Sequence, residues 1–172
     1  MSLKGKKVAV LAEEMYQEME LWVPYYRLKE EGADVKVVAP EKKTYKSKLG
    51  YPVNADVAAA DVSAKDFDGV VIPGGYAPDM MRRYKAMLDI VKGCFDQGKP
   101  VAAICHAGWV PISAGILKGK TATCFFAIKD DMVNAGARYV DQEVVVDGNL
   151  ITSRTPADLP AFCRELVKAL EK

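Results

Sequence analysis

The chain has 172 residues, half of them hydrophobic and 27% charged, and its formal net charge is +1. This length and composition fit a single globular domain, residues 1–172, with a full-sized core. A nearly neutral chain offers no broad basic surface for nucleic acid, and no apolar run approaches the ~18 residues of a membrane span. We therefore expect neither a nucleic-acid nor a membrane partner.

The chain start and the cysteines limit the remaining classes. Residues Met1–Gly5 lack the apolar segment of a signal peptide, and we expect a flexible or tag-derived start there. The four cysteines show no Cys-x-x-Cys spacing, and the chain has one histidine, so we expect no metal site. Reduced thiols favour a cytoplasmic location, and nothing in the sequence indicates a cofactor.

The first forty residues alternate strand, helix and strand. Buried strands are predicted at Lys7–Leu11 and Asp34–Ala39, with a helix at Gln17–Glu31 between them. Pro24 should kink this helix or delay its start. On the inner face of the helix we expect Met19, Trp22, Val23, Tyr26 and Leu28. Such a βαβ unit makes the sheet parallel.

The rest of the chain continues the alternation. Buried strands at Gly69–Pro73 and Val101–Ile104 each precede a helix, at Pro78–Gln97 and Ala107–Leu117. The other predicted elements are a hairpin at Tyr45–Val57, a turn at Asp61–Asp66, a strand at Thr121–Phe125, a helix at Ile128–Asn134, short strands between Tyr139 and Ser153, and a closing helix at Pro156–Leu170. This order predicts a doubly wound α/β fold with helices on both faces of a mostly parallel sheet. Its ligand site should lie at the carboxyl ends of the strands.

Cys105 occupies the turn between the strand Val101–Ile104 and the helix that follows. A side chain at such a turn resembles the nucleophile elbow of α/β hydrolases, with sulfur in place of a hydroxyl. The helix N-terminus favours a thiolate, so we expect a pKa below the ~8.5 of free cysteine. A buried structural cysteine is the competing interpretation, because cysteine is common in cores.

Two further features should lie near Cys105. Gly74 and Gly75 follow the neighbouring strand, and a Gly75 amide beside that of His106 could stabilise an oxyanion. A simple tight turn is the alternative for the two glycines. His106 is expected to act as a nearby base, although a capping role fits the sequence equally well.

Five sequence blocks carry a resemblance to a known family. They are Pro73–Asp79, Ala103–His106, Ile112–Gly119, Ile128–Ala137 and Val144–Arg154. Together they resemble the PfpI-type intracellular proteases of the ThiJ/PfpI superfamily, and the likeness runs from Val8 to Leu170. The resemblance implies a flavodoxin-like domain that assembles as a dimer or hexamer and carries a reactive thiol at Cys105.

The resemblance also implies roles for other residues. The family pairs its histidine with an acid from a neighbouring subunit, and these positions match His106 and Asp79. Its first-helix Glu aligns with Gln17, whose amide can donate to sulfur but cannot take up and return a proton. The oxyanion and substrate positions match Gly74, Gly75, Tyr76 and Phe125. Phe125 lacks the hydroxyl of the usual Tyr, and Tyr76 stands where Arg is common.

These features support two functional hypotheses. The first is a stress-related cysteine enzyme in which Cys105 attacks a carbonyl, with glyoxalase or deglycase activity on α-oxoaldehydes or weak peptidase activity. Its partners would be a small carbonyl compound or a peptide. The alternative, which Gln17 favours, is a non-catalytic redox-sensing or chaperone-like stress protein. A glutamine amidotransferase needs a downstream histidine, and none follows His106.

Overall fold

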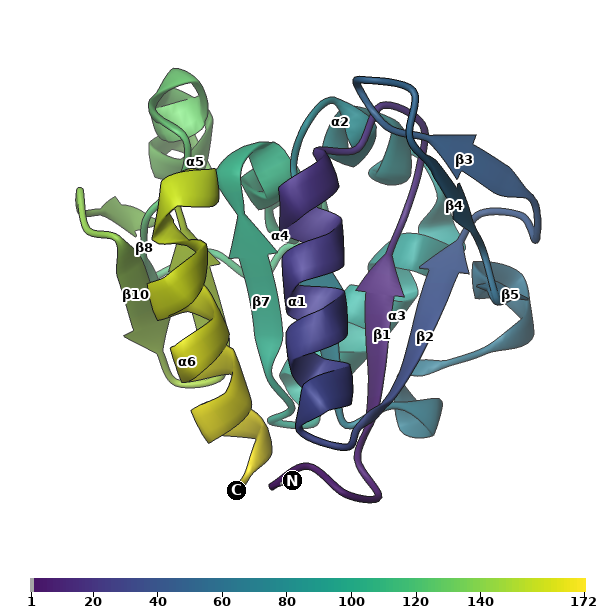
Figure 1. Cartoon of the computed structure of the whole chain (residues 1–172). Helices are drawn as coiled ribbons and strands as arrows, with labels where there is room; N and C mark the ends of the chain where they lie inside the picture. Colours follow the sequence, from purple (N-terminus) through teal and green to yellow (C-terminus); the bar gives the residue numbers. More distant parts are fainter. Residues whose placement is uncertain (1) are drawn as a thin grey trace.

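A computed structural model describes residues 2–172 of the chain, and Met1 lies outside the described residues. Its centre is a seven-stranded sheet with the strand order β10-β11-β7-β6-β1-β2-β5 (Figure 1). Every pairing in this sheet is parallel except that of β10 with β11. The predicted α/β fold with a mainly parallel sheet is confirmed.

The strands of the central sheet are short, and those in its middle are more buried than those at its edges. They are β1 (Lys7–Leu11), β2 (Asp34–Ala39), β5 (Val57–Ala58), β6 (Gly69–Ile72), β7 (Val101–Ile104), β10 (Val144–Asp147) and β11 (Leu150–Ser153). Valine, isoleucine and alanine dominate β6 and β7, in which every residue is buried, as expected for strands covered on both faces. Two smaller sheets pair β3 (Thr44–Lys46) with β4 (Pro52–Asn54) and β8 (Thr121–Ala122) with β9 (Arg138–Tyr139).

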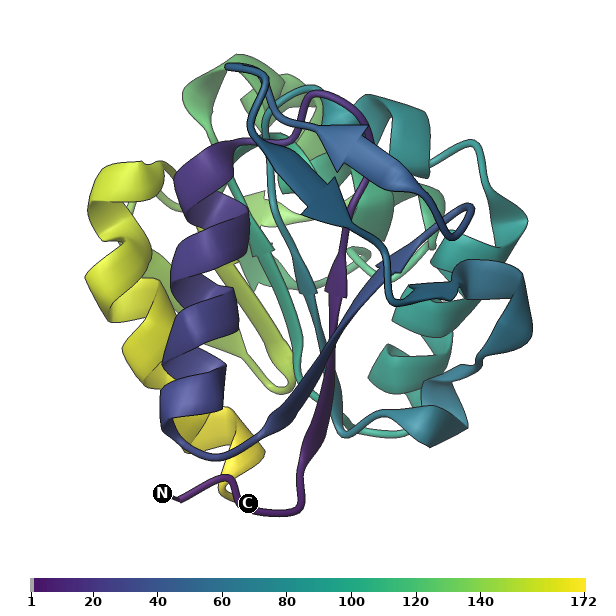
Figure 2. The same ribbon diagram turned by 45° about the vertical axis from the view of Figure 1, so that its right-hand side comes forward.

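Helices cover both faces of the sheet. The α-helices are α1 (Glu18–Glu30), α2 (Ala77–Met81), α3 (Lys85–Asp96), α4 (Trp109–Ser113), α5 (Lys129–Asn134) and α6 (Leu159–Leu170). Helices α1 and α6 lie side by side on one face, and α3 lies on the other (Figures 1 and 2). The β3–β4 hairpin leans over the end of the sheet where β1 and β6 finish (Figure 2).

Three predicted elements are shorter than expected. The helix predicted at Pro78–Gln97 is divided into α2 and α3, because Tyr84 adopts an extended conformation between them. The helix predicted at Ala107–Leu117 is a 3₁₀ turn, Cys105–Gly108, followed by α4. The strand predicted at Thr121–Phe125 ends with β8, because Phe125 already precedes the next 3₁₀ turn.

The predicted inner face of α1 is wrong for Met19, Val23 and Tyr26, whereas Leu28 is buried and Trp22 is half-buried against the core. Met19 and Tyr26 are 52% and 62% exposed, whereas Glu20 and Leu21 are fully buried. The helix contains Pro24 but starts only one residue later than predicted. It is therefore rotated so that a carboxyl side chain, and not the larger apolar ones, faces the sheet.

Residues near the start of the chain contact the rest of the domain. Leu3 is buried in the core and its amide donates to the Glu31 carbonyl at 2.9 Å. The Ser2 hydroxyl donates to the Glu31 carboxylate at 3.0 Å. The two ends of the chain lie close together at the amino end of the sheet (Figure 1). Within residues 2–172, none of the helices has both the length and the apolar character to cross a membrane.

Candidate active site

Three loops meet at the carboxyl end of the sheet. Strands β1, β6 and β7 are neighbours, so the segments that follow them are brought together as predicted. Tyr16, in the loop after β1, forms a bridge with Gly75, and the Gln17 amide donates to the Gly74 carbonyl at 3.1 Å. Cys105 is the first residue after β7. This edge therefore contains both glycines and the thiol.

Cys105 has the strained backbone of a nucleophile elbow. Its φ is 64°, a left-handed conformation that costs a non-glycine residue roughly 1–2 kcal/mol. The amides of His106 and Gly75 lie near its sulfur and act to lower the pKa of the thiol. The residue is 7% exposed. Although the thiol is nearly enclosed, polar groups surround it, which does not fit a cysteine that merely fills the core.

His106 contacts the thiol directly. Its Nδ1 lies 3.3 Å from the Cys105 sulfur. The Phe125 ring stacks on the imidazole at a centroid distance of 4.8 Å, and Trp109 lies 5.3 Å away. Burial lowers the pKa of His106, and the positive charge of Lys48 lowers it further. A neutral imidazole in this position can accept the proton of the thiol.

Glu20 is a site residue that the sequence interpretation missed. Its side chain is fully buried, and its Oε2 accepts a hydrogen bond from the Gly74 amide at 2.8 Å. Its Oε1 has no partner among the nitrogen and oxygen atoms of residues 2–172. The carboxyl also interacts with the Cys105 thiol. Burial raises the pKa of Glu20 to about 7, so at neutral pH a large fraction carries a proton that it can donate to sulfur.

Gln17 does not occupy the place that the sequence alignment gave it. It is the N-cap of α1, and its side-chain oxygen accepts a hydrogen bond from the Glu20 amide at 2.9 Å. The carboxyl beside sulfur therefore comes from three residues later in the chain. The sequence did contain a sign of the Glu20 position. Glu20, Pro24 and Leu28 are spaced four residues apart, so they share one face of the helix, and an acid stands there among apolar residues.

The expected low pKa of Cys105 is not supported by the structure. Burial raises the pKa of the thiol to about 12, and the charge of Glu20 raises it as well. The amides of His106 and Gly75 act in the opposite direction. Protonation of Glu20 removes the second of these causes and provides a donor to sulfur. The resting site is thus a thiol beside a neutral imidazole, not a free thiolate.

The remaining candidates lie around the entrance. Tyr76 follows Gly75 and is 55% exposed. Asp79 is exposed in the first turn of α2, and within residues 2–172 no hydrogen bond joins it to His106. Gly74 lies so close to Glu20 and Cys105 that an added Cβ would be 2.5 Å from the Glu20 carboxylate. In the same described residues, no cluster of three or more histidine, cysteine or acidic side chains could hold a metal ion.

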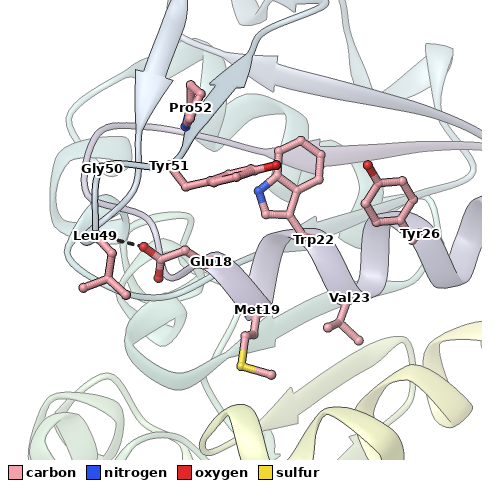
Figure 3. A pocket seen from close by; sticks show the side chains of 9 residues that line it. All are labelled: Glu18, Met19, Trp22, Val23, Tyr26, Leu49, Gly50, Tyr51 and Pro52. Atoms are coloured by element: carbon pink, nitrogen blue, oxygen red, sulfur yellow. Dashed lines mark hydrogen bonds between the residues drawn. The ribbon is translucent and has the colours of Figure 1, made fainter.

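The outer face of α1 carries a hollow of about 610 Å³ that is separate from the thiol. Met19, Trp22, Val23 and Tyr26 line it from the helix, and Tyr51 closes it from the loop between β3 and β4 (Figure 3). The Trp22 and Tyr51 rings meet edge to face at 5.9 Å. This surface is apolar and exposed, as a contact surface for another chain would be.

Comparison with known proteins identifies the family. The model of the DJ-1/PfpI family matches residues 6–169. The chain belongs to the DJ-1/PfpI family. A relative in Pyrococcus abyssi, named a deglycase, is 47% identical over 165 residues, which are 96% of this chain and 99% of the relative. General stress protein 18 of Bacillus subtilis is 43% identical over 98% of this chain and 99% of its own length.

Solved structures agree with the DJ-1/PfpI assignment. A two-domain protein of Anabaena variabilis, described as having DJ-1/ThiJ/PfpI-like and ferritin-like domains, matches with a TM-score of 0.94 and 46% identity. The match covers 96% of this chain and 48% of that protein, so the chain spans about half of it. The predicted family resemblance is confirmed.

Proposed function

We propose that the chain is a cysteine-dependent enzyme acting on small carbonyl compounds, with the glyoxalase or deglycase chemistry of α-oxoaldehydes and their adducts. The observation that carries the proposal is the meeting of three groups at one sulfur. Cys105 is presented on an elbow, the His106 Nδ1 lies 3.3 Å from its sulfur, and the buried Glu20 carboxyl interacts with the thiol. The deglycase names of similar chains support the same chemistry.

The first step is addition of the thiol to an aldehyde carbon. The sulfur forms a bond to carbon while its proton passes to Nδ1 of His106, and the carbonyl oxygen becomes an alkoxide. The amides of Gly75 and His106, which interact with the sulfur, are the donors we propose to stabilise this negative charge. Return of the proton gives a hemithioacetal, so no atom or charge is left over.

Glu20 supplies the proton transfers of the next step. In a hemithioacetal of an α-oxoaldehyde, the carbon that carries sulfur loses a proton and the neighbouring ketone carbon gains one. The result is a thioester of a hydroxy acid, which water hydrolyses to release the thiol. A carboxyl with a pKa of about 7 can both accept and return that proton near neutral pH. Gln17 cannot take up and return a proton, but Glu20 can perform this step.

The enclosure of the sulfur favours small substrates over peptides. Cys105 is 7% exposed, and the Phe125 and Trp109 rings close around His106. A two- or three-carbon carbonyl compound needs little space, whereas a peptide bond needs a groove on both sides of the nucleophile. The non-catalytic, redox-sensing alternative rested on Gln17, and it loses that support with Glu20 beside the thiol.

We extend the proposal to assembly and location. The apolar outer face of α1 fits a contact with a second copy of the chain, and a dimer or hexamer formed there is the assembly we propose. Asp79, exposed on α2, is the acid we propose to reach the His106 of a neighbouring subunit. The four cysteines are all free thiols, which fits a reducing compartment such as the cytoplasm.

The test is the rate at which the purified protein consumes methylglyoxal, a small α-oxoaldehyde. Cys105→Ala should abolish turnover, and Glu20→Gln should lower it by about 10²–10⁴-fold. Gln17→Glu is the matched control and should change turnover by less than about threefold, because an N-cap side chain does not take part in proton transfer. Full activity of Cys105→Ala, or a large gain with Gln17→Glu, would overturn the proposal.

A further inference from the structure

A single lysine stands at the entrance of the candidate active site. Lys48 lies in the loop between β3 and β4, and its amide donates to the Tyr16 carbonyl at 3.0 Å. Tyr16 bridges Ser47 on one side and Gly75 on the other. The backbone of Tyr16 therefore joins the lysine loop to the glycine whose amide contacts the sulfur.

The side chain of Lys48 extends over the entrance. Its ammonium nitrogen lies 5.5 Å from the centroid of the Tyr76 ring. Its charge acts on both buried titratable partners of the thiol, since it lowers the pKa of His106 and of Glu20. These two effects agree with the ring contact in placing the ammonium group near the Cys105 site.

No carboxylate of residues 2–172 lies within 4.0 Å of this ammonium group. Among the ion pairs formed within residues 2–172, none includes Lys48. The acid Glu18 lies close enough for the charge of Lys48 to lower its pKa, and its Oε1 accepts a hydrogen bond from the Leu49 amide at 2.8 Å (Figure 3). Lys48 is thus an exposed cation that is not in ion-pair contact with any carboxylate of residues 2–172.

We propose that Lys48 binds the anionic group of the substrate, so that the enzyme prefers carbonyl compounds that carry a carboxylate or phosphate away from the reacting carbonyl. The proposal rests on the proposed function for its substrate class, but the recognition of anions by Lys48 does not require turnover. An exposed ammonium–carboxylate contact of this kind changes a binding constant by about 2- to 5-fold. It also weakens as salt screens the charges.

The first experiment measures anion recognition without catalysis. Iodoacetate and iodoacetamide are electrophiles of nearly equal size that differ in charge, and both alkylate a cysteine thiol. The ratio of their rate constants at Cys105, with the labelled site identified by peptide mass spectrometry, reports the local attraction for an anion. Lys48→Met should lower this ratio about 2- to 5-fold, and Lys48→Arg should restore it. Lys46→Met, which removes an exposed lysine of the same hairpin, should leave it unchanged.

The second experiment compares turnover of 4-carboxyphenylglyoxal with that of its neutral carbamoyl analogue. Lys48→Met should lower the ratio of kcat/KM for the carboxylate to kcat/KM for the neutral analogue about 2- to 5-fold, because a change in the pKa of His106 or Glu20 affects both compounds alike. If neither compound is turned over but the alkylation ratio depends on Lys48, the proposed function fails and the anion site stands. If turnover occurs and neither ratio responds to Lys48→Met, or both respond equally to Lys46→Met, the anion site is refuted.

Discussion

Because Glu20 is buried, its ionisation should make the stability of the protein depend on pH. Glu20→Gln should remove this contribution. The carboxyl has a pKa of about 7 in the folded chain, against an ordinary value of 4.5. Between these two values the folded state binds more protons than the unfolded state, so the free energy of unfolding falls as pH rises. At about 1.4 kcal/mol per pKa unit, the loss amounts to about 3 kcal/mol by pH 8.5.

Glu20→Gln keeps an oxygen acceptor for the Gly74 amide but cannot ionise. The assay is urea unfolding of both proteins at several pH values from 4.5 to 8.5. The free energy of unfolding of the variant, minus that of the wild type, should rise by about 3 kcal/mol over this range. Other titrating groups cancel in this difference.

Glu18→Gln provides the matched control. Burial is the largest single effect on the pKa of Glu18 and raises it, but hydrogen bonds from Ser47 and Leu49 and the charge of Lys48 together bring the pKa below its ordinary value. Any stability that its charge contributes is therefore lost only as pH falls below about 4.5. Its difference from the wild type should be flat from pH 5 to 8.5. A flat difference for Glu20→Gln as well would refute the reasoning about the buried carboxyl.

Three further predictions concern the other parts of the site. Gly74→Ala should lower turnover of methylglyoxal by about 10²-fold with the fold retained by circular dichroism, because its Cβ would lie 2.5 Å from the Glu20 carboxylate and displace it; unchanged turnover would contradict the close packing. His106→Gln should lower turnover by about 10²–10⁴-fold and remove the pH dependence of the thiol's alkylation near neutrality, and an unchanged pH profile would exclude the imidazole as base. Tyr26→Lys, on the exposed face of α1, should shift the sedimentation profile toward the monomer, whereas an unaltered profile would place the interface elsewhere.

The position of the site could be predicted because it depends on the order of a few strands. A parallel βαβ sheet brings the ends of adjacent strands to one edge, and Gly75 and Cys105 each follow a buried apolar strand directly. The position of the turn at Cys105 was also predictable. A strand that is followed directly by helical residues must change direction within one or two residues.

The carboxyl partner of the thiol could not be read from alignment alone. Counting from Val8 assigns the position to Gln17, but Met15, with a φ of 60°, bends the loop before the helix. The sequence of the helix gives only a weak indication of its buried face, because Leu21 and Trp22 are adjacent and apolar residues occur on several faces. Its orientation is set by the hydrogen bond between Glu20 and the Gly74 amide, a contact between residues 54 positions apart.

The charge at the entrance was also hidden in the sequence. Lys48 is one of several lysines in a polar hairpin, and nothing in the local pattern distinguishes it from Lys46. Contacts with Tyr16, among them its bridge to Ser47 and the hydrogen bond from the Lys48 amide, bring this loop to the glycine edge of the sheet. Contacts of this type depend on tertiary structure, and no periodicity in the sequence encodes them.

The most direct test of the catalytic role of the Cys105 thiol is conversion of methylglyoxal in D₂O, followed by proton NMR. The account predicts many turnovers to lactate per protein, with deuterium entering the carbon that Glu20 protonates to the extent that its proton exchanges with solvent. It predicts no lactate with Cys105→Ala and about 10²–10⁴-fold less with Glu20→Gln. Lactate formed at the wild-type rate by Cys105→Ala would contradict the account.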